Sequence, residues 1–215
     1  MIDLFEKYKY VVKREGLYFD HISNFDDRFN EPEHNKLNYA EICRTFSHVF
    51  DEQGRTVADK IIPVTHNRDV APAEFFEYAQ ADAKLIAVGS KPMVTDEQWE
   101  AIDGVRTDMG VRVHRFGNMK FDDLVKYRLN SADSTRYARA GMYGRDIWFW
   151  DDEINRPVNI DLRSNEVTSR HIEFLKVIFG FRLNDIIAHV DLLWVVNMYC
   201  TQKVQAYLTD VLGIE

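Results

Sequence analysis

Residues able to do acid, base or nucleophilic chemistry recur near the ends of the predicted strands of this 215-residue chain. They comprise two carboxylates, two imidazoles and a glycine–serine pair, at Asp20, His66, Gly89, Ser90, His114 and Asp133. Functional groups of parallel α/β folds collect at the carboxyl ends of the strands, where loops vary on a rigid scaffold. We therefore expect these side chains to line one rim and to serve acid/base or nucleophilic catalysis.

Apolar runs alternate with segments of helical periodicity along the first two thirds of the chain. Strands are predicted over residues 17–22, 60–65, 85–89, 111–116 and 130–133. Helices are predicted over residues 2–16, 37–50, 73–81, 96–109 and 121–127. Strands that alternate with helices of about 10 to 15 residues indicate parallel βαβ units, and continuous apolar strands indicate burial on both faces. The predicted fold class is therefore α/β.

The last third of the chain has a different pattern. Residues 146–150 form a possible sixth strand, and a turn is expected at 155–157. Two helices are predicted from residue 168 onward, divided near Gly180, with the second over 184–212. The second helix has an apolar face suited to a core or an oligomer interface, made of Ile187, Val190, Leu193, Trp194, Val196 and Met198. We expect a catalytic-like domain over 1–150 and a helical extension over 151–215, packed on that domain or at an oligomer interface.

Each candidate residue also has a purely structural interpretation. Asp133, followed by Ser and Thr, could be the N-cap of a helix. Asp20 lies in an apolar run, where an unpaired carboxylate is costly to bury, so function is favoured there. His66 could be an ordinary loop histidine, His114 could point into the core, and Gly89 could begin a tight turn.

Composition limits the function classes. The chain carries 27 basic and 35 acidic residues, a formal charge of −8, so any contact with nucleic acid must be local. Its two cysteines form no metal-binding spacing and no disulfide framework, which favours a reducing, cytoplasmic compartment and gives no sign of a cofactor. No signal-peptide pattern occurs near the N-terminus, and no apolar run approaches the roughly 20 residues of a membrane span.

Residues 130–141 contain a specific local pattern. Asp133 is followed by a Thr-Arg-x-x-Arg-x-Gly element with one residue between, at Thr135, Arg136, Arg139 and Gly141. This pattern resembles the tRNA-guanine transglycosylase superfamily, the queuine tRNA-ribosyltransferase-like proteins, in which a strand carries the nucleophilic aspartate. Residues 2–144 are more similar still to the small DNA-guanine transglycosylase-like barrel proteins of phages and mobile elements, which insert 7-deazaguanine bases into DNA.

The resemblance implies a fold, a reaction and roles for the candidate residues. The fold would be a partial or modified (β/α)8 TIM-type barrel with five to six parallel strands and a helical C-terminal extension. Asp133 would attack the glycosidic carbon, and Asp20 would be the second catalytic residue, holding the base edge. The base pocket and the phosphate contacts would come from His66, Gly89, Ser90, His114, Arg136 and Arg139. The partners would be DNA or tRNA and a purine-like base, with no membrane, in a phage or prokaryotic host cell.

Two features of that family have no counterpart in this chain. The cysteine-rich zinc motif is absent, so no structural metal is implied, and the N-terminal third of the family's barrel is missing. We therefore expect a second copy or a partner subunit to complete the barrel, since open sheet edges are normally covered.

Two other classes remain open. One is a metal-dependent barrel hydrolase, with ligands drawn from Asp20, His21, His66 and His114. The other is a non-catalytic subunit of a nucleic-acid-modifying complex, which would offer a surface at Trp148, Phe149 and Trp150 and on the C-terminal helices.

Overall fold

The computed structural model describes residues 4–25, 31–65, 70–89, 94–117, 120–132, 146–162, 164 and 166–213. The chain divides into two compact units. The first contains Met1–Asn118 and Leu129–Ala132, and the second contains Met119–Arg128 and Asp133–Glu215. The five candidate residues Asp133, His66, Ser90, Arg136 and Arg139 lie outside the described residues.

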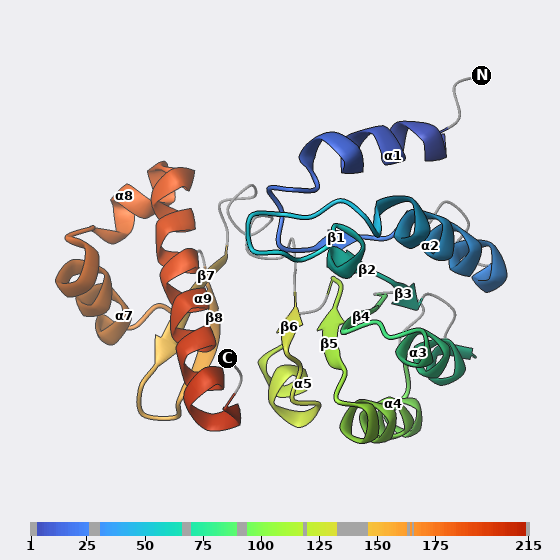
Figure 1. The fold of residues 1–215 in the computed structure, drawn as a ribbon. Coiled ribbons are helices and arrows are strands. Elements are labelled where there is room, and N and C mark those ends of the chain that lie inside the picture. Colours follow the sequence, from blue (N-terminus) through green and yellow to red (C-terminus); the bar gives the residue numbers. More distant parts are fainter. Residues whose placement is uncertain are drawn as a thin grey trace. The chain divides into compact units, whose positions relative to one another are not determined.

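The first unit alternates helices with short strands, in agreement with the predicted βαβ pattern (Figure 1). Its helices are α1 (Leu4–Glu15), α2 (Pro32–Phe46), the 3₁₀ turn η1 (Ala58–Lys60), α3 (Ala71–Gln80) and α4 (Asp96–Met109). Its strands are β1 (Ile22–Ser23), β2 (Ile61–Ile62), β3 (Val64–Thr65), β4 (Leu85–Val88), β5 (Arg112–Arg115) and β6 (Ser131–Ala132).

All described strand pairs of the first unit are parallel, and neighbouring strands follow one another in the chain. β3, β4, β5 and β6 form one sheet in that order, and β1 pairs with β2. Pro63, which has no N–H, separates β2 from β3, yet its carbonyl still accepts a bond from Ala87 N at 2.8 Å. The α/β class with parallel strands is thus confirmed.

The two faces of the sheet are covered differently. Arg115 lies over the ring of Trp99 on α4, so the odd-numbered residues of β5 face the helices. α3 and α4 pack side by side on that face (Figure 1). The opposite face carries an apolar cluster of Ile62, Val64, Leu85 and Ala87, with Phe116 packed against it.

The predicted strand over 17–22 is wrong in most of its length. Only Ile22 in that run joins a strand, and Leu17, Tyr18 and Phe19 are exposed in the connection from α1. Three consecutive apolar residues indicated burial, but the chain is still turning here, with Tyr18 N bonded to Glu15 O at 2.9 Å.

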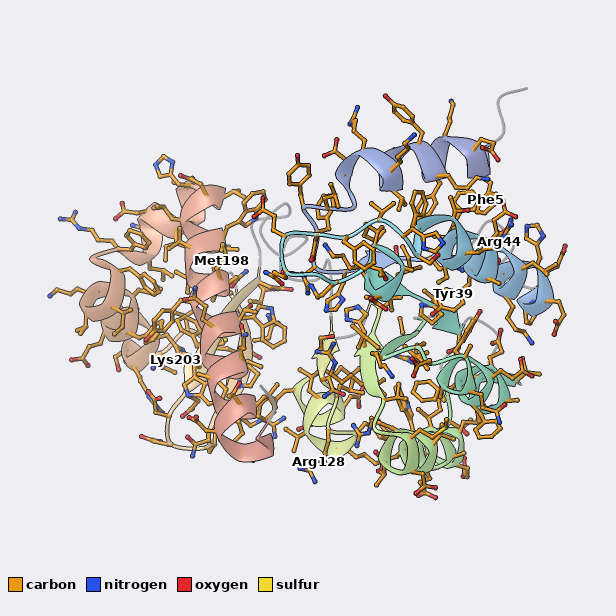
Figure 2. The ribbon with its side chains drawn as sticks, viewed as in Figure 1. Phe5, Tyr39, Arg44, Arg128, Met198 and Lys203 are labelled. Carbon is orange, nitrogen blue, oxygen red and sulfur yellow. The ribbon has the colours of Figure 1, made fainter. Side chains whose placement is uncertain are left out.

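α1 covers the outer edge of β1. Asn24 N donates to Ile62 O at 2.8 Å, so the N–H of Asn24 faces β2. Because successive residues of a strand point their peptide groups in opposite directions, the N–H and carbonyl of Ser23 face away from β2. The Tyr8 hydroxyl donates to the outward-facing carbonyl of Ser23. The rings of Phe5 and Tyr8 lie 5.6 and 5.3 Å from that of Phe25, and Phe5 is labelled in Figure 2.

The second unit contains a β-hairpin among helices. Its elements are α5 (Phe121–Lys126), β7 (Asp146–Asp151), β8 (Arg156–Asp161), α7 (Ser169–Phe174), the π-helical turn η3 (Leu175–Phe179), α8 (Leu183–Ala188) and α9 (Val190–Leu212). The predicted sixth strand exists as β7, but it pairs antiparallel with β8, and Asn155 adopts a φ of 50° in the turn between them. The predicted domain boundary after residue 150 falls inside this hairpin, whose two strands belong to the second unit.

The core of the second unit lies between the hairpin and α9. Ile147, Phe149, Leu193 and Val196 are buried in one cluster. The Asn197 amide oxygen, on α9, accepts a bond from Trp148 N at 2.8 Å. The predicted helix over 184–212 is interrupted at His189, whose backbone is extended.

Candidate active site

The carboxyl ends of β5 and β6 bring the predicted site residue His114 together with Ser131, which was not among the predicted site residues. His114 and Ser131 are paired in register, and the His114 Nδ1 to Ser131 Oγ distance is 2.9 Å. Asn130 fixes this register because its side-chain oxygen accepts from Val113 N at 2.8 Å while its own N–H donates to Val113 O at 3.1 Å. His114 therefore points to the face of the sheet opposite the helices, and not toward the helix-covered face.

Apolar side chains surround the His114–Ser131 pair. Val64 and Ala87 lie in register with His114 across β3, β4 and β5, and both belong to the apolar cluster on this face. The ring of Phe116 contacts that of His114 edge to face at 4.5 Å. An imidazole–hydroxyl pair on an apolar surface resembles the usual lining of a small-molecule site, with few polar groups among apolar ones.

Gly89 follows β4 at the same edge. Its N–H donates to Thr65 O at 2.8 Å, so the sheet uses this amide and holds the backbone in place. The Thr65 side chain is buried, and its hydroxyl has no hydrogen-bond partner within the described ranges.

Buried amides hold the carboxyl end of β1, and the sequence prediction missed them. Asn24 Nδ2 donates to Asn35 O at 3.1 Å, and Asn38 Nδ2 donates to Phe25 O at 3.2 Å. Asn35 and Asn38 lie on α2, three residues apart and therefore on one face. Two asparagines within a helix, where their propensity is poor, were the available signal.

Asp20 does not lie at this rim. It precedes β1, at the opposite, amino edge of the strands, and its side chain is 79% exposed. The register of the strands places it about five residues from the level of His114, on the order of 16 Å along the strand direction. Its carboxylate accepts from Arg55 Nη2 at 2.9 Å, and this hydrogen bond lowers the pKa of Asp20. Its predicted role at the base edge is therefore not supported by its position.

The amino edge instead holds a buried ion pair. Lys60 Nζ lies 2.9 Å from Asp51 Oδ2, with the two side chains only 2% and 5% exposed. Lys60 also donates to the carbonyls of Gly16 and Leu17, at 3.2 Å each. Asp51 accepts from the N–H groups of Gln53 and Arg55, at 2.9 Å each. These bonds around Lys60 and Asp51 hold the segment after α1 against the start of β2, and we interpret them as structural.

A metal centre gains no support from the described part of the chain. Within it, no three His, Cys, Asp or Glu side chains gather as potential ligands. His21, beside Asp20, also precedes β1, and its pKa is lowered first by burial and then by Arg112.

The two cysteines are unsuited to be nucleophiles. Burial raises the pKa of Cys43 to about 11 and that of Cys200 to about 12. Both thiols are therefore protonated near neutral pH, where only a thiolate would attack.

The aromatic cluster at Trp148, Phe149 and Trp150 is mainly core. Phe149 and Trp150 are buried, and Trp150 contacts Tyr207 of α9 at a ring distance of 5.4 Å. This cluster therefore does not form the exposed partner surface that a non-catalytic subunit would need.

Comparison of the chain with family models, with curated proteins and with solved structures finds no match. No helix among the described residues has both the length and the apolar character needed to cross a bilayer.

Proposed function

We propose that this chain is a transglycosylase-like enzyme that exchanges a guanine-type base for a 7-deazaguanine in DNA or tRNA, with Asp133 as nucleophile. The observation that supports it most is the pairing of β5 with β6. β6 ends at Ala132, one residue before Asp133 in the sequence, and it holds Ser131 against His114. A carboxylate that directly follows a parallel strand in the sequence suits attack at a glycosidic carbon.

We also propose that the parallel strands belong to a modified (β/α)8 barrel. The strands follow chain order, all described pairs in the first unit are parallel, and helices connect them. One face is covered by helices while the other carries apolar residues and His114, as the inner face of such a barrel would.

The reaction would proceed in two displacements. An oxygen of the Asp133 carboxylate forms a bond to the glycosidic carbon while the carbon–nitrogen bond breaks, and its electron pair leaves with the departing base. A ring nitrogen of the incoming base then attacks the same carbon and releases the carboxylate. The proton gained by the departing base equals the proton lost by the incoming one, and the His114 imidazole is the group suited to carry it.

The proposed pocket differs from the one expected from the sequence. Gly89 and His114 stay in it, together with His66 and Ser90, which follow β3 and β4 in the sequence. Arg136 and Arg139 would bind phosphates through their planar guanidinium groups. Asp20 is left out because it lies at the amino edge. The target nucleotide must be flipped out or single-stranded to enter such a site.

An Asp133→Asn variant tests the nucleophile. The full chain would be incubated with labelled 7-deazaguanine bases and either DNA oligonucleotides or tRNA, followed by separation under denaturing conditions. The wild type should incorporate label and yield a covalent protein–nucleic acid band, and Asp133→Asn should yield neither. Asp103→Asn, an exposed aspartate on α4, is the matched control and should keep full activity. Full incorporation by Asp133→Asn would contradict the proposal.

Assembly is tested by measuring mass in solution while activity is assayed. We propose that a second copy or a partner subunit completes the site, so the active species should be larger than the 25.3 kDa chain. Because α1 already covers the outer edge of β1, such a partner need not pair with that strand edge. Activity that elutes only at monomer mass would overturn the assembly without affecting the role of Asp133.

A further inference from the structure

The outward face of α1 exposes basic and apolar side chains together. Leu4, Lys7, Tyr10, Val11 and Arg14 recur at intervals of three and four residues and are all exposed. The opposite face, with Phe5, Tyr8 and Val12, packs against the rest of the first unit, so the outward face is left to solvent. Tyr10 is 62% exposed on this face.

The connection after α1 extends this surface. Tyr18 is 81% exposed, the highest value among the large apolar side chains of the described residues, and Phe19 beside it is also exposed. Aromatic rings of this kind offer flat faces on which unpaired bases stack.

The charge of this region is opposite to that of the chain. Residues 4–19 carry four basic and two acidic side chains, a formal charge of +2, in a chain whose total is −8. Lys7 and Lys13 are exposed and form no ion pair within the described ranges, whereas Lys9 is held by Glu6 and Glu41. Arg14 pairs only with the adjacent Glu15 there and lies over the Tyr10 ring at 5.9 Å.

The direction of α1 connects this face with the candidate site. Phe5 and Tyr8, in the first two turns, contact Phe25 and Ser23 at the carboxyl end of β1. Tyr18 follows Leu17, whose carbonyl accepts a bond from Lys60 at the amino edge. The helix has 12 residues, so it spans about 18 Å at 1.5 Å per residue. A polyanion bound along it would reach the edge of the sheet that carries His114.

We propose that a surface made of Lys7, Tyr10 and Arg14 on the outward face of α1, Lys13 on its flank, and Tyr18 and Phe19 in the connection, which we call the α1 face, binds single-stranded nucleic acid and leads it to the carboxyl edge. The cations contact phosphates and the aromatic rings stack on unpaired bases. The proposal rests on the proposed function for the identity of the substrate. A membrane-bound helix buries a broad apolar face, whereas on α1 the side chains of Phe5, Tyr8 and Val12 pack inside the protein and the exposed Leu4 and Val11 lie among basic side chains.

The test measures binding of a fluorescent 20-nucleotide single-stranded DNA of mixed sequence to the full chain by anisotropy, at several salt concentrations. The Asp133→Asn background removes chemistry from the readout. Replacing Lys7 and Lys13 by Gln should reduce the slope of log affinity against log salt by about 1.4, since each phosphate contact contributes about 0.7 for single strands. Tyr18→Ala should weaken binding about tenfold with little change in that slope.

Matched controls lie elsewhere on the surface. Lys176→Gln on η3 and Phe50→Ala remove an exposed cation and an exposed ring outside the α1 face, and both should leave affinity within about twofold. The proposal is overturned if the α1 variants bind like these controls, if no DNA binds, or if only anionic phosphatidylglycerol vesicles bind. If base exchange is still observed with any of these results, the proposed function is unaffected.

Discussion

The two ends of the parallel strands in the first unit are built differently. At the amino edge, Lys60 and Asp51 are buried and bonded to each other and to nearby backbone groups. At the carboxyl edge, the Thr65 hydroxyl is buried without a partner in the described residues, and His114 and Ser131 pair on an apolar face. The first arrangement holds chain segments together, whereas the second places the His114–Ser131 pair on the face of the sheet opposite the helices. If the proposed function holds, one edge of the strands provides stability and the other provides the reactive groups.

The largest effect is expected at the amino edge. Lys60→Met removes the ammonium group but leaves the Asp51 carboxylate buried, so the free energy of unfolding should fall by about 3 kcal/mol. Urea denaturation measures this change. The double variant with Asp51→Leu should recover part of the loss, because no charge then remains buried. A single variant as stable as the wild type would show that this edge does not carry the stability assigned to it.

Substitutions at the carboxyl edge should lower activity and leave stability nearly unchanged. His114→Ala removes the proposed proton carrier and should lower the rate of base exchange about 100-fold. Its urea midpoint should stay close to that of the wild type, because the residue is only partly buried. Ser131→Ala should have a smaller effect on the rate in the same assay. If His114→Ala greatly lowered stability but left the rate per folded molecule unchanged, the carboxyl edge would be structural and the comparison between the two edges would be wrong.

Acid should weaken the amino edge. The bond from Lys60 is the largest cause that holds the pKa of Asp51 well below its ordinary value of 3.8. The folded pKa is lowered, so its stabilisation is present above pH 3.8 and is lost as the pH falls below that value. Denaturation of the wild type at pH 5, 4 and 3 should show decreasing stability. Asp51→Asn should show a flatter dependence, and parallel curves for the two proteins would contradict the assignment.

The smallest effect is expected for Asp20→Asn. The side chain is exposed and bonds Arg55 at the amino edge, so base exchange should stay within about twofold of the wild type. Steady-state incorporation of label measures it, with Asp133→Asn as the inactive reference. A large loss of activity would restore Asp20 to the site and would show that the edges are not functionally separate.

Local signals made some elements predictable. The helix over 96–109 was predicted with the bounds of α4, because a capping box at Thr95 and Gln98 starts it and Gly110, in a left-handed conformation, ends it. α2 begins at Pro32, five residues before the predicted start, although proline is favoured in the first turn of a helix.

Other features depended on distant contacts. The apolar run before β1 indicated a longer strand, but only Ile22 and Ser23 find a parallel neighbour. Among the candidate residues, His114 could be placed near a strand end, whereas its partner Ser131 follows from a register that Asn130 fixes. Asp20 was misplaced for the same reason, because a strand that starts later moves it from one edge to the other.

The bond from Tyr8 to Ser23 bears on how the chain avoids aggregation. A strand edge with unpaired peptide groups is a template for pairing with other molecules during folding. α1 precedes β1 in the chain and is therefore synthesised before the edge that it covers. In a nascent chain, α1 would therefore be available to cover the edge of β1 as soon as β1 emerges from the ribosome, when exposed strand edges are most prone to aggregation.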